Sequence, residues 1–338
     1  MLPNPEVLKC YEKNNISITD LKKIKIKYDI NFKFTKKSSL YYYVPEIKFF
    51  DHIACFDLDW TLTYSMKHLY PKDPDDIYIL PNRRKVLENL IKNGYNIVIF
   101  TNQFAKSENE KKKKVERVSN FLRKIKLPIS VFIATEKDGY RKPEIKAFEE
   151  YINITGVKAN FKKLYFIGDA IGRPQDFDDS DKKFASNIKA TLLSPEELFP
   201  PSTLPEFKTH NQVIIFVGPP GSGKTSFYKK YLCPYNGSLS SHLHVNQDQL
   251  KTKQKVLSTL KMFLSTGKSI VIDSTNPDRS EYYKIIPKSY SILVLHFVRD
   301  GYGWNKLRKE KVPDIVYHLY YKKFSPFTED ENVVKVWY

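Results

Sequence analysis

The sequence contains 338 residues, of which 41% are hydrophobic and 14% aromatic, and its formal net charge is +18 at pH 7. This composition excludes an intrinsically disordered chain, and the length leaves room for two ordinary domains. No apolar run of about 18 residues occurs, and the N-terminus lacks a basic segment followed by an apolar core, so we expect neither a transmembrane helix nor a signal peptide.

The charge and the cysteines indicate the partners and the compartment. A basic excess of this size favours polyanions, because lysine and arginine displace the counterions condensed on phosphate backbones. A lysine-rich composition without a binding role is the alternative. Cys10, Cys55 and Cys233 form no metal-binding spacing and no even set for disulfides, which is typical of a reducing compartment. We therefore expect an intracellular protein.

Residues 1–48 are polar and rich in lysine and carry no catalytic motif, so we expect a lead-in without a recognised domain. Residues 49–200 alternate short apolar runs with segments of helical period. The expected strands are 53–56, 96–100, 131–134, 164–167 and 191–193, and the expected helices are 83–92, 111–124 and 145–151. This alternation is typical of a Rossmann-like α/β domain with a parallel sheet.

The run "SENEKKKKVERVSNFLRKIK" at 107–126 carries many charges on one helical segment. We expect a solvent-exposed helix there rather than a phosphate-binding patch. Its expected apolar stripe consists of Val115, Val118, Phe121, Leu122 and Ile125.

Two carboxylates follow the first expected strand in "ACFDLDWTLTYS", at 54–65. Asp57 is placed to attack a phosphorus atom and form an aspartyl-phosphate. Asp59 could protonate the leaving oxygen and later deprotonate the attacking water. Two anions that face a phosphate need a cation, so we expect Mg²⁺ here.

Three later strand ends supply matching groups. Thr101, in "IVIFTNQ", offers a hydroxyl to the phosphoryl oxygens, and Lys142, in "GYRKPE", offers a fixed cation. Asp169, in "LYFIGDAIGR", offers another carboxylate to Mg²⁺. Together with Asp57 and Asp59, this set resembles the signature of the haloacid-dehalogenase-like phosphatases.

Prolines mark the boundary that follows. The segment "SPEELFPPSTLPEFKTHNQ" contains four prolines between residues 195 and 205, and proline at this density interrupts both helices and strands. We expect a linker at 201–211 and a second Rossmann-like α/β domain at 212–338. Its expected strands are 213–217, 244–246, 269–273 and 292–297.

The stretch "VIIFVGPPGSGKTSF" fits the phosphate-binding pattern G-x-x-x-x-G-K-[ST] at 218–225. Its glycines let successive backbone N–H groups turn toward a polyphosphate, Lys224 can reach the β- and γ-phosphates, and the hydroxyl of Thr225 can hold Mg²⁺. We expect ATP to contact a set of residues in this loop and two beyond it: Gly218, Gly221, Ser222, Gly223, Lys224, Thr225, Ser226 and Arg308.

Two further strand ends complete a kinase-like set. Asp248, in "HVNQDQLK", could accept the proton of an attacking hydroxyl, and Asp273, in "SIVIDSTNPD", is placed to support the metal. The segment "YGWNKLRKEK" predicts a helix that carries Lys306, Arg308 and Lys309. Such cations could cover the transferring phosphoryl group as a lid, although a solvent-exposed charged face is the alternative.

The two halves together resemble the polynucleotide kinase/3′-phosphatase family over residues from about 50 to about 327. The matching blocks are "FDLDWTLT", "FTNQ", "RKPE", "GDAIGRPQDFDDSDKKFASNI", "GPPGSGKTSF", "HVNQD" and "IDSTNPD". The resemblance implies removal of 3′-phosphates by the first domain and ATP-dependent phosphorylation of 5′-hydroxyls by the second. It also implies that Asp57 is the nucleophile, Asp59 the acid/base, Asp248 the kinase base, and Asp57, Asp59, Asp169 and Thr225 the groups around Mg²⁺.

Three departures from that family stand out. Trp60 occupies a position that usually holds glycine, and it could stack on a base or narrow the entrance. Gln247 stands where an arginine commonly precedes the kinase aspartate, although Lys251 follows one turn later. The segment before the first domain is too short for the forkhead-associated domain of some members, so we expect none.

The resulting hypothesis is a monomeric enzyme that heals nucleic acid ends, DNA above all, and thereby prepares strand breaks for ligation in DNA repair. Such a substrate favours the nucleus as its compartment. Three alternatives remain open: the same chemistry on RNA ends, a small-molecule phosphatase fused to a metabolite kinase, and a protein whose kinase half is weak or only binds nucleic acid.

Overall fold

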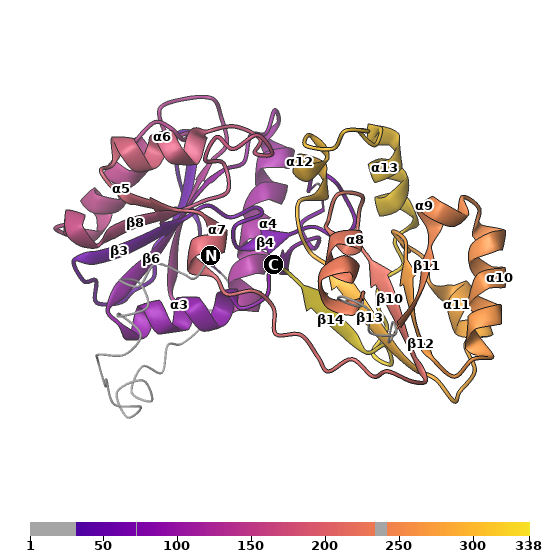
Figure 1. The fold of residues 1–338 in the computed structure, drawn as a ribbon. Coiled ribbons are helices and arrows are strands. Elements are labelled where there is room, and N and C mark those ends of the chain that lie inside the picture. Colours follow the sequence, from indigo (N-terminus) through magenta and orange to yellow (C-terminus); the bar gives the residue numbers. More distant parts are fainter. Residues whose placement is uncertain (1–31, 72, 234–241) are drawn as a thin grey trace. The chain divides into compact units, whose positions relative to one another are not determined.

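The computed structural model describes residues 32–71, 73–233 and 242–338 (Figure 1). The chain divides into two compact units: Met1–Ser65 with Tyr70–Pro200, and Met66–Leu69 with Pro201–Tyr338. Cys10 and most of the expected lead-in, up to residue 31, lie outside the described residues. Within the described ranges, no helix combines the length and the apolar character that a membrane crossing requires.

The first unit is built on a seven-stranded sheet with the strand order β1-β2-β7-β6-β3-β8-β9. These strands are β1 (Thr35–Lys37), β2 (Leu40–Tyr43), β3 (His52–Phe56), β6 (Tyr95–Asn102), β7 (Ile129–Ala134), β8 (Leu164–Ile167) and β9 (Thr191–Leu193). Five neighbouring strands, β7, β6, β3, β8 and β9, are parallel to one another. The hairpin adds the antiparallel pairs, β1 with β2 and β2 with β7. The carboxyl ends of the parallel strands therefore meet at one edge of the sheet.

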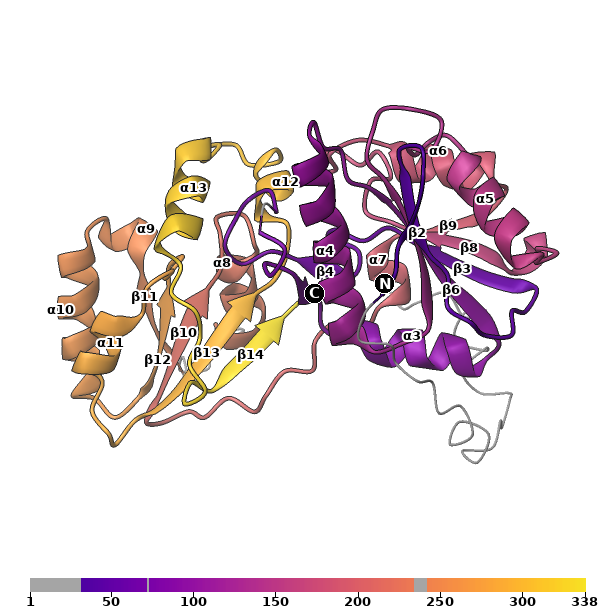
Figure 2. The same ribbon diagram turned by 180° about the vertical axis from the view of Figure 1, so that it is seen from behind.

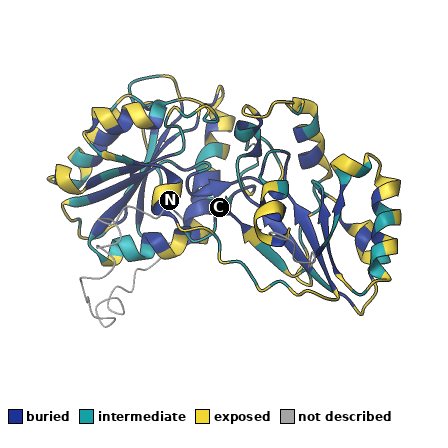
Figure 3. Ribbon diagram, in the orientation of Figure 1, coloured by how far each residue is buried: buried dark blue, intermediate teal, exposed yellow. Residues whose placement is uncertain are grey.

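Helices cover both faces of this sheet, as Figures 1 and 2 show. They are α3 (Arg83–Lys92), α4 (Glu108–Ile125), α5 (Lys146–Thr155), α6 (Ser180–Asn187) and the short α7 (Pro195–Leu198). A small hairpin, β4 (Thr63–Tyr64) with β5 (Tyr78–Ile79), forms a separate two-stranded sheet. Because both faces are covered, the central strands consist of nearly continuous buried apolar residues (Figure 3).

Aromatic packing under α5 and α6 forms the main core of the first unit. Phe100 of β6 packs against Phe132 of β7 with ring centres 5.3 Å apart, and Phe184 of α6 lies 5.4 Å from Phe100. Tyr151 of α5 meets Phe132 edge-on at 5.9 Å. This core fixes the sheet whose carboxyl edge carries the predicted phosphatase residues.

The β1–β2 hairpin lies in the segment that the sequence assigned to a lead-in. Leu40 is fully buried in the same core, and Tyr42 stacks on Phe132 with ring centres 5.7 Å apart. The first unit therefore begins before the expected boundary at residue 49. The hairpin joins the sheet because it pairs with β7, a contact between segments that lie about ninety residues apart in the chain.

The second unit is a five-stranded, all-parallel sheet with the order β11-β12-β10-β13-β14. The strands are β10 (Gln212–Val217), β11 (His242–Asn246), β12 (Ser269–Asp273), β13 (Ser291–Phe297) and β14 (Val333–Val336). The helices are α8 (Lys224–Phe227), α9 (Gln247–Leu250), α10 (Lys253–Leu264), α11 (Ser280–Ile285), α12 (Gly301–Asn305) and α13 (Asp314–Lys323). The edge strand β14 has no counterpart among the expected strands.

The proline-rich segment between the two sheets behaves as the composition suggests. Residues 201–208 contain neither helix nor strand.

Each expected strand of both domains is present, and the strand bounds differ from the expected ones by two residues or fewer at each end. Both units are thus α/β structures built on parallel strands, as expected.

Candidate active sites

Three carboxylates meet at the carboxyl edge of the first sheet. One oxygen from each of Asp57, Asp169 and Asp181 lies within 4.8 Å of the others. Asp57 directly follows β3, Asp169 follows β8, and Asp181 lies in the first turn of α6. Carboxylate oxygens are the ligands that Mg²⁺ prefers. The donor set of this carboxylate cluster therefore fits Mg²⁺.

Lys142 bridges two members of the carboxylate cluster. Its buried ammonium lies 2.5 Å from Asp57 Oδ1 and 2.6 Å from Asp181 Oδ1. Burial alone would lower the pKa of Lys142, but the charges of Asp181 and Asp57 outweigh it and raise that pKa. Burial, together with the nearby Asp181, raises the pKa of Asp57 to about 7, although Lys142 opposes this shift. One lysine does not balance three carboxylates, so a cation would relieve the remaining repulsion.

Asp59 has a different environment from Asp57. Its Oδ1 accepts a hydrogen bond from the Arg117 guanidinium at 2.6 Å, and its Oδ2 accepts one from Gln103 Nε2 at 2.7 Å. Burial would raise the pKa of Asp59, but the charge and hydrogen bond of Arg117 lower it below its ordinary value. Gln103 also donates to Thr101 Oγ1 at 2.8 Å. The two aspartates thus differ in environment: burial raises the pKa of Asp57, whereas the Arg117 guanidinium lowers that of Asp59.

Thr61 connects the loop after β3, which carries Asp57 and Asp59, to the carboxylate cluster. Its hydroxyl donates to Asp169 Oδ1 at 2.9 Å, and its carbonyl accepts a hydrogen bond from Arg83 Nε at 3.0 Å. The buried Arg83 guanidinium lies 4.2 Å from the centre of the Phe199 ring. Trp60, between the two loop carboxylates and Thr61, has a φ of 60°. Glycine suits such a left-handed backbone, because it has no Cβ. Trp60 adopts this backbone although side chains other than glycine disfavour it.

The structure brings most of the predicted phosphatase residues together. Asp57, Lys142 and Asp169 share the cluster, and Thr101 connects to Asp59 through Gln103. The carboxylate of Asp59, which we expected at the metal, is bound instead by Arg117 and Gln103. Within the described residues, Asp181 supplies the third carboxylate.

Sequence reasoning missed Asp181 and Arg117. Asp181 follows Asp176, Asp178 and Asp179 in one acidic segment, and nothing in the pattern distinguishes it from them. Arg117 stands four residues before Phe121 in α4 and therefore lies on the same helical face as the apolar stripe. Its side chain is 2% exposed. The signal in the sequence was that Arg117, a charged residue, lies on the apolar face of the expected helix, where it needs a buried partner.

In the second unit, the glycine loop lies between β10 and α8. Gly221 and Gly223 have φ values of 79° and 94°, which glycine adopts without strain. Lys224 is buried, and its ammonium donates to the carbonyls of Gly218 at 2.8 Å and Pro219 at 2.7 Å. Burial lowers the pKa of Lys224 to about 8. The hydrogen-bond partners described for this ammonium are two backbone carbonyls and the Ser222 hydroxyl, and a phosphate would offer it a directly bonded charged partner.

Asp273, at the end of β12, collects three donors on one oxygen. Its Oδ2 accepts hydrogen bonds from Thr225 Oγ1 at 2.9 Å and from Asn246 Nδ2 at 3.0 Å, and His244 Nε2 lies 3.1 Å from it. His244 in turn stacks on Tyr228 with ring centres 3.6 Å apart. The Thr225 hydroxyl, which we expected at the metal, thus contacts Asp273, the carboxylate that we expected to support the same metal.

Asp248 and Gln247 lie in α9, which directly follows β11. Asp248 is exposed, so its carboxylate is open to a substrate, whereas the Gln247 side chain accepts a hydrogen bond from the Ser274 hydroxyl. Ser226 is exposed on α8.

The expected lid helix ends earlier than predicted. α12 ends at Asn305, so Lys306, Arg308 and Lys309 lie beyond it, exposed. The chain turns away because the Asn305 side chain bonds to both the N–H and the carbonyl of Val312, at 2.9 Å and 2.8 Å. Gly301 and Gly303 also make this helix a weak one. The cations of this segment therefore lie on a loop.

Comparisons with known proteins show which family the chain is similar to. A family model described as "Polynucleotide kinase 3 phosphatase" matches residues 52–199. A protein of Acanthamoeba polyphaga mimivirus, whose name places it among the bifunctional polynucleotide phosphatase/kinases, is 32% identical over 360 residues, covering 84% of this chain and 83% of its own. The bifunctional polynucleotide phosphatase/kinase of Schizosaccharomyces pombe is 31% identical, with coverage of 66% and 60%.

Two further similarities are narrower. A polynucleotide 3′-phosphatase of Arabidopsis thaliana is 31% identical over 172 residues, which cover 45% of this chain and 24% of that protein. Among solved structures, a D,D-heptose 1,7-bisphosphate phosphatase from B. bronchiseptica aligns with 42% of this chain and 78% of its own, at 15% identity and a TM-score of 0.33. A likeness of that size is too slight to bear on function.

The Arg117–Asp59 pair predicts a selective loss of activity. We expect Arg117→Met to lower phosphomonoesterase kcat by about 100-fold, because a mispositioned acid–base group forfeits much of its catalytic contribution. Arg123→Met, on the exposed face of the same helix, is the matched control. Steady-state rates with circular dichroism of both variants check this. Equal rates for the two folded variants would contradict it.

Gly223 predicts an effect confined to the second unit. A Cβ at Gly223 would lie 2.4 Å from the Tyr338 hydroxyl oxygen, and its φ of 94° is strained for alanine. We expect Gly223→Ala to abolish detectable phosphoryl transfer from ATP. Gly267→Ala is the control, because Gly267 has a φ of 71° but no atom closer than 3.8 Å to a new Cβ. A transfer assay in which both variants lose activity equally would show that backbone strain alone is responsible.

Proposed function

The chain belongs to the bifunctional polynucleotide phosphatase/kinase family, and on that premise we propose that its first unit removes 3′-phosphates from nucleic acid ends while its second phosphorylates 5′-hydroxyls with ATP. The carboxylate cluster with Lys142 is the observation that carries the first activity. The glycine loop with the Thr225–Asp273 pair supports the second.

In the proposed phosphatase reaction, Asp57 attacks the phosphorus, and the bond to the 3′ oxygen breaks as an aspartyl-phosphate forms. Lys142 holds the nucleophile in place and offsets the charge of the phosphoryl group. Mg²⁺, when bound by Asp57, Asp169 and Asp181, would supply the further positive charge needed where these carboxylates face the substrate phosphate. Thr101 is placed to orient the phosphoryl oxygens.

Asp59 would serve both halves of the reaction. It delivers a proton to the leaving 3′ oxygen and then takes one from the water that hydrolyses the aspartyl-phosphate. The guanidinium of Arg117 keeps the pKa of Asp59 low, which suits the second task, since a base must be ionised. Gln103 fixes the orientation of the carboxylate at 2.7 Å.

In the proposed kinase reaction, the loop at 218–225 wraps the phosphates of ATP, and Lys224 moves from its backbone carbonyls to the phosphoryl oxygens. Asp248 accepts the proton of the 5′-hydroxyl as its oxygen attacks the γ-phosphorus, and the bond between that phosphorus and the bridging oxygen breaks to release ADP. Thr225 and Asp273 would hold the Mg²⁺ that accompanies ATP. The exposed Arg308 would contact the phosphates from the loop after α12.

DNA ends at strand breaks are the substrate we propose, which places the enzyme in DNA repair and favours the nucleus. The net charge of +18 supports a polyanionic substrate. RNA ends are the second candidate, because the same charge would serve them. Comparing kcat/KM on matched DNA and RNA strands that carry a 3′-phosphate or a 5′-hydroxyl separates the two.

Two separate sites predict separable losses. We expect Asp57→Asn to abolish 3′-phosphatase activity and leave kinase activity within about twofold, and Lys224→Met to do the reverse, because each removes a group that touches the reacting phosphate in its own unit. Release of phosphate and transfer of labelled γ-phosphate, measured on one oligonucleotide, test both. A single substitution that removed both activities from a folded chain would refute the two-site arrangement.

Asp181 predicts a metal effect. We expect Asp181→Asn to raise the Mg²⁺ concentration needed for half-maximal phosphatase activity at least tenfold, because a carboxylate of the cluster and a partner of Lys142 are both lost. Asp179→Asn is the control, since Asp179 pairs only with the exposed Lys183 among the ion pairs described. Mg²⁺ titrations of both variants decide the matter. Unchanged Mg²⁺ dependence in Asp181→Asn would argue against a role for Asp181 at the metal.

A kinase half that only binds nucleic acid is the remaining alternative. The substitution that suggested it, Gln247, places its side chain against Ser274, so no cation stands at that position. Transfer of γ-phosphate to a 5′-hydroxyl oligonucleotide at a rate that Asp248→Asn abolishes would exclude the alternative.

A further inference from the structure

Phe104 is an exposed aromatic residue next in sequence to a hydrogen-bond partner of Asp59. It directly follows Gln103, whose side chain donates to Asp59 at 2.7 Å, and its own side chain is 44% exposed. The backbone on both sides of it is fixed, because Gln103 N–H donates to the Ala134 carbonyl at 2.8 Å and Ala105 N–H to the Thr135 carbonyl at 3.0 Å. The fold therefore presents Phe104 to solvent from a rigid position at the carboxyl edge of β6.

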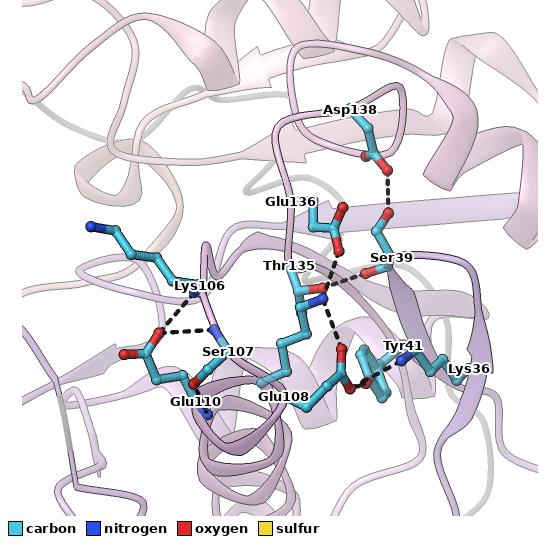
Figure 4. Close-up of polar contacts among 11 residues, drawn as sticks. Lys36, Ser39, Tyr41, Lys106, Ser107, Glu108, Glu110, Thr135, Glu136 and Asp138 are labelled. Atoms are coloured by element: carbon cyan, nitrogen blue, oxygen red, sulfur yellow. Dashed lines mark hydrogen bonds and ion pairs between the residues drawn. The ribbon is translucent and has the colours of Figure 1, made fainter.

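Lys137 lies against the Phe104 ring. Its ammonium is 5.6 Å from the ring centre, the geometry of a cation–π contact. The side chains on both sides of Lys137 are held by hydrogen bonds. The Glu136 carboxylate accepts one from Lys111 at 2.6 Å, and the Asp138 carboxylate accepts one from the Ser39 hydroxyl (Figure 4). Thr135 also donates to the Ser39 carbonyl at 2.6 Å.

The segment that follows Phe104 is held just as firmly. The Glu110 carboxylate accepts hydrogen bonds from the backbone N–H groups of Lys106 at 2.7 Å and Ser107 at 3.4 Å, and the Ser107 hydroxyl caps α4 (Figure 4). We call the pair of segments, residues 103–107 and 135–138, the rim. Contacts from neighbouring side chains hold the rim, while Phe104 and Lys137 face each other on it.

Exposure alone does not distinguish Phe104, since single exposed phenylalanines are normal on a protein surface. Phe161 and Phe177 of the same unit are 56% and 81% exposed. Two features set Phe104 apart. It adjoins the residue that touches Asp59, and it pairs with a cation on a second fixed segment. An aromatic face beside a positive charge is what a nucleotide, with one base and one phosphodiester, can use.

We propose that Phe104 and Lys137 form a platform for the nucleotide that carries the 3′-phosphate: the base stacks on Phe104, and Lys137 contacts the phosphodiester on its 5′ side. The proposal rests on the proposed 3′-phosphatase function and names the part of the substrate that the site would bind. Stacking tolerates any base, so the platform would favour nucleic acid over small phosphomonoesters without selecting a sequence.

The test compares substrates with and without the terminal base. On a 3′-phosphorylated oligodeoxynucleotide, we expect Phe104→Ala to raise KM about tenfold with kcat nearly unchanged, in line with the alanine cost of one base stack. On the same oligonucleotide with an abasic terminal nucleotide, we expect the wild-type enzyme to lose a similar factor and Phe104→Ala to lose no more. Phe104→Trp should restore the wild-type KM, whereas Phe104→Leu should not.

The control variant is Phe161→Ala. Phe161 lies in the short turn of 3-10 helix (Phe161–Lys163) that precedes β8, at the amino edge of the sheet, so its loss should leave both KM values unchanged. Hydrolysis of p-nitrophenyl phosphate, which has no nucleotide to stack, should not distinguish Phe104→Ala from wild type. A loss of that activity would mean that Phe104 acts structurally and would overturn the platform.

Lys137 has its own readout. We expect Lys137→Ala to reduce the slope of log(kcat/KM) against log[salt] by about one, as the loss of one phosphate contact does. An unchanged slope would overturn the role of Lys137. Equal base and abasic ratios in wild type and Phe104→Ala would overturn the stacking role. Wild-type enzyme that cleaves p-nitrophenyl phosphate but no 3′-phosphorylated oligonucleotide would instead refute the proposed function.

Discussion

The bridge from Lys142 to Asp57 and Asp181 is the interaction on which the first unit's site depends. Three carboxylates within 4.8 Å of one another repel, and two of them face a buried ammonium at 2.5 Å and 2.6 Å. Removing Lys142 would leave these buried carboxylates without their cation, which is strongly destabilising. The bridge also ties the end of β3, the loop after β7 and the start of α6 to one point, so it aligns the edge that carries the carboxylate cluster.

The second unit solves the same electrostatic problem without a lysine or arginine beside the carboxylate, among the ion pairs described. Asp273 Oδ2 is surrounded by a hydroxyl, an amide and an imidazole within 3.1 Å, and no lysine or arginine pairs with it among the ion pairs described. Lys224 meanwhile stays on backbone carbonyls. In the first unit, Lys142 is paired directly with the carboxylates of the cluster. In the second unit, Lys224 is bonded to backbone carbonyls of the glycine loop and not to Asp273, among the contacts described. Each arrangement leaves negative charge that a divalent cation would balance.

Much of this architecture was predictable, because buried parallel strands read as apolar runs. Asp57 and Asp169 were predicted from their place after two of these runs, and Lys142 and Lys224 from the motifs "GYRKPE" and "GPPGSGKTSF". Tertiary contacts decided the rest. The β1–β2 hairpin is too polar to be recognised alone and owes its place to β7. The lid helix failed because Asn305 closes a loop with Val312, a contact that helical periodicity does not reveal. Asp181 and Arg117 became visible only when the chain brought them to Asp57 and Asp59.

Helix α4 shows why the net charge is an imperfect guide to function. The charged run suggested a solvent-exposed face, yet Lys111 is 8% exposed and pairs with Glu108 and Glu136, while Arg117 reaches Asp59. Part of the basic excess thus forms ion pairs inside the protein, with Glu136 of the rim and with Asp59. The cations left for a nucleic acid are those, such as Lys137, that a fixed backbone presents beside the site. Placement, more than number, therefore determines where a phosphate backbone would lie, because a charge already paired contributes little new attraction to a polyanion.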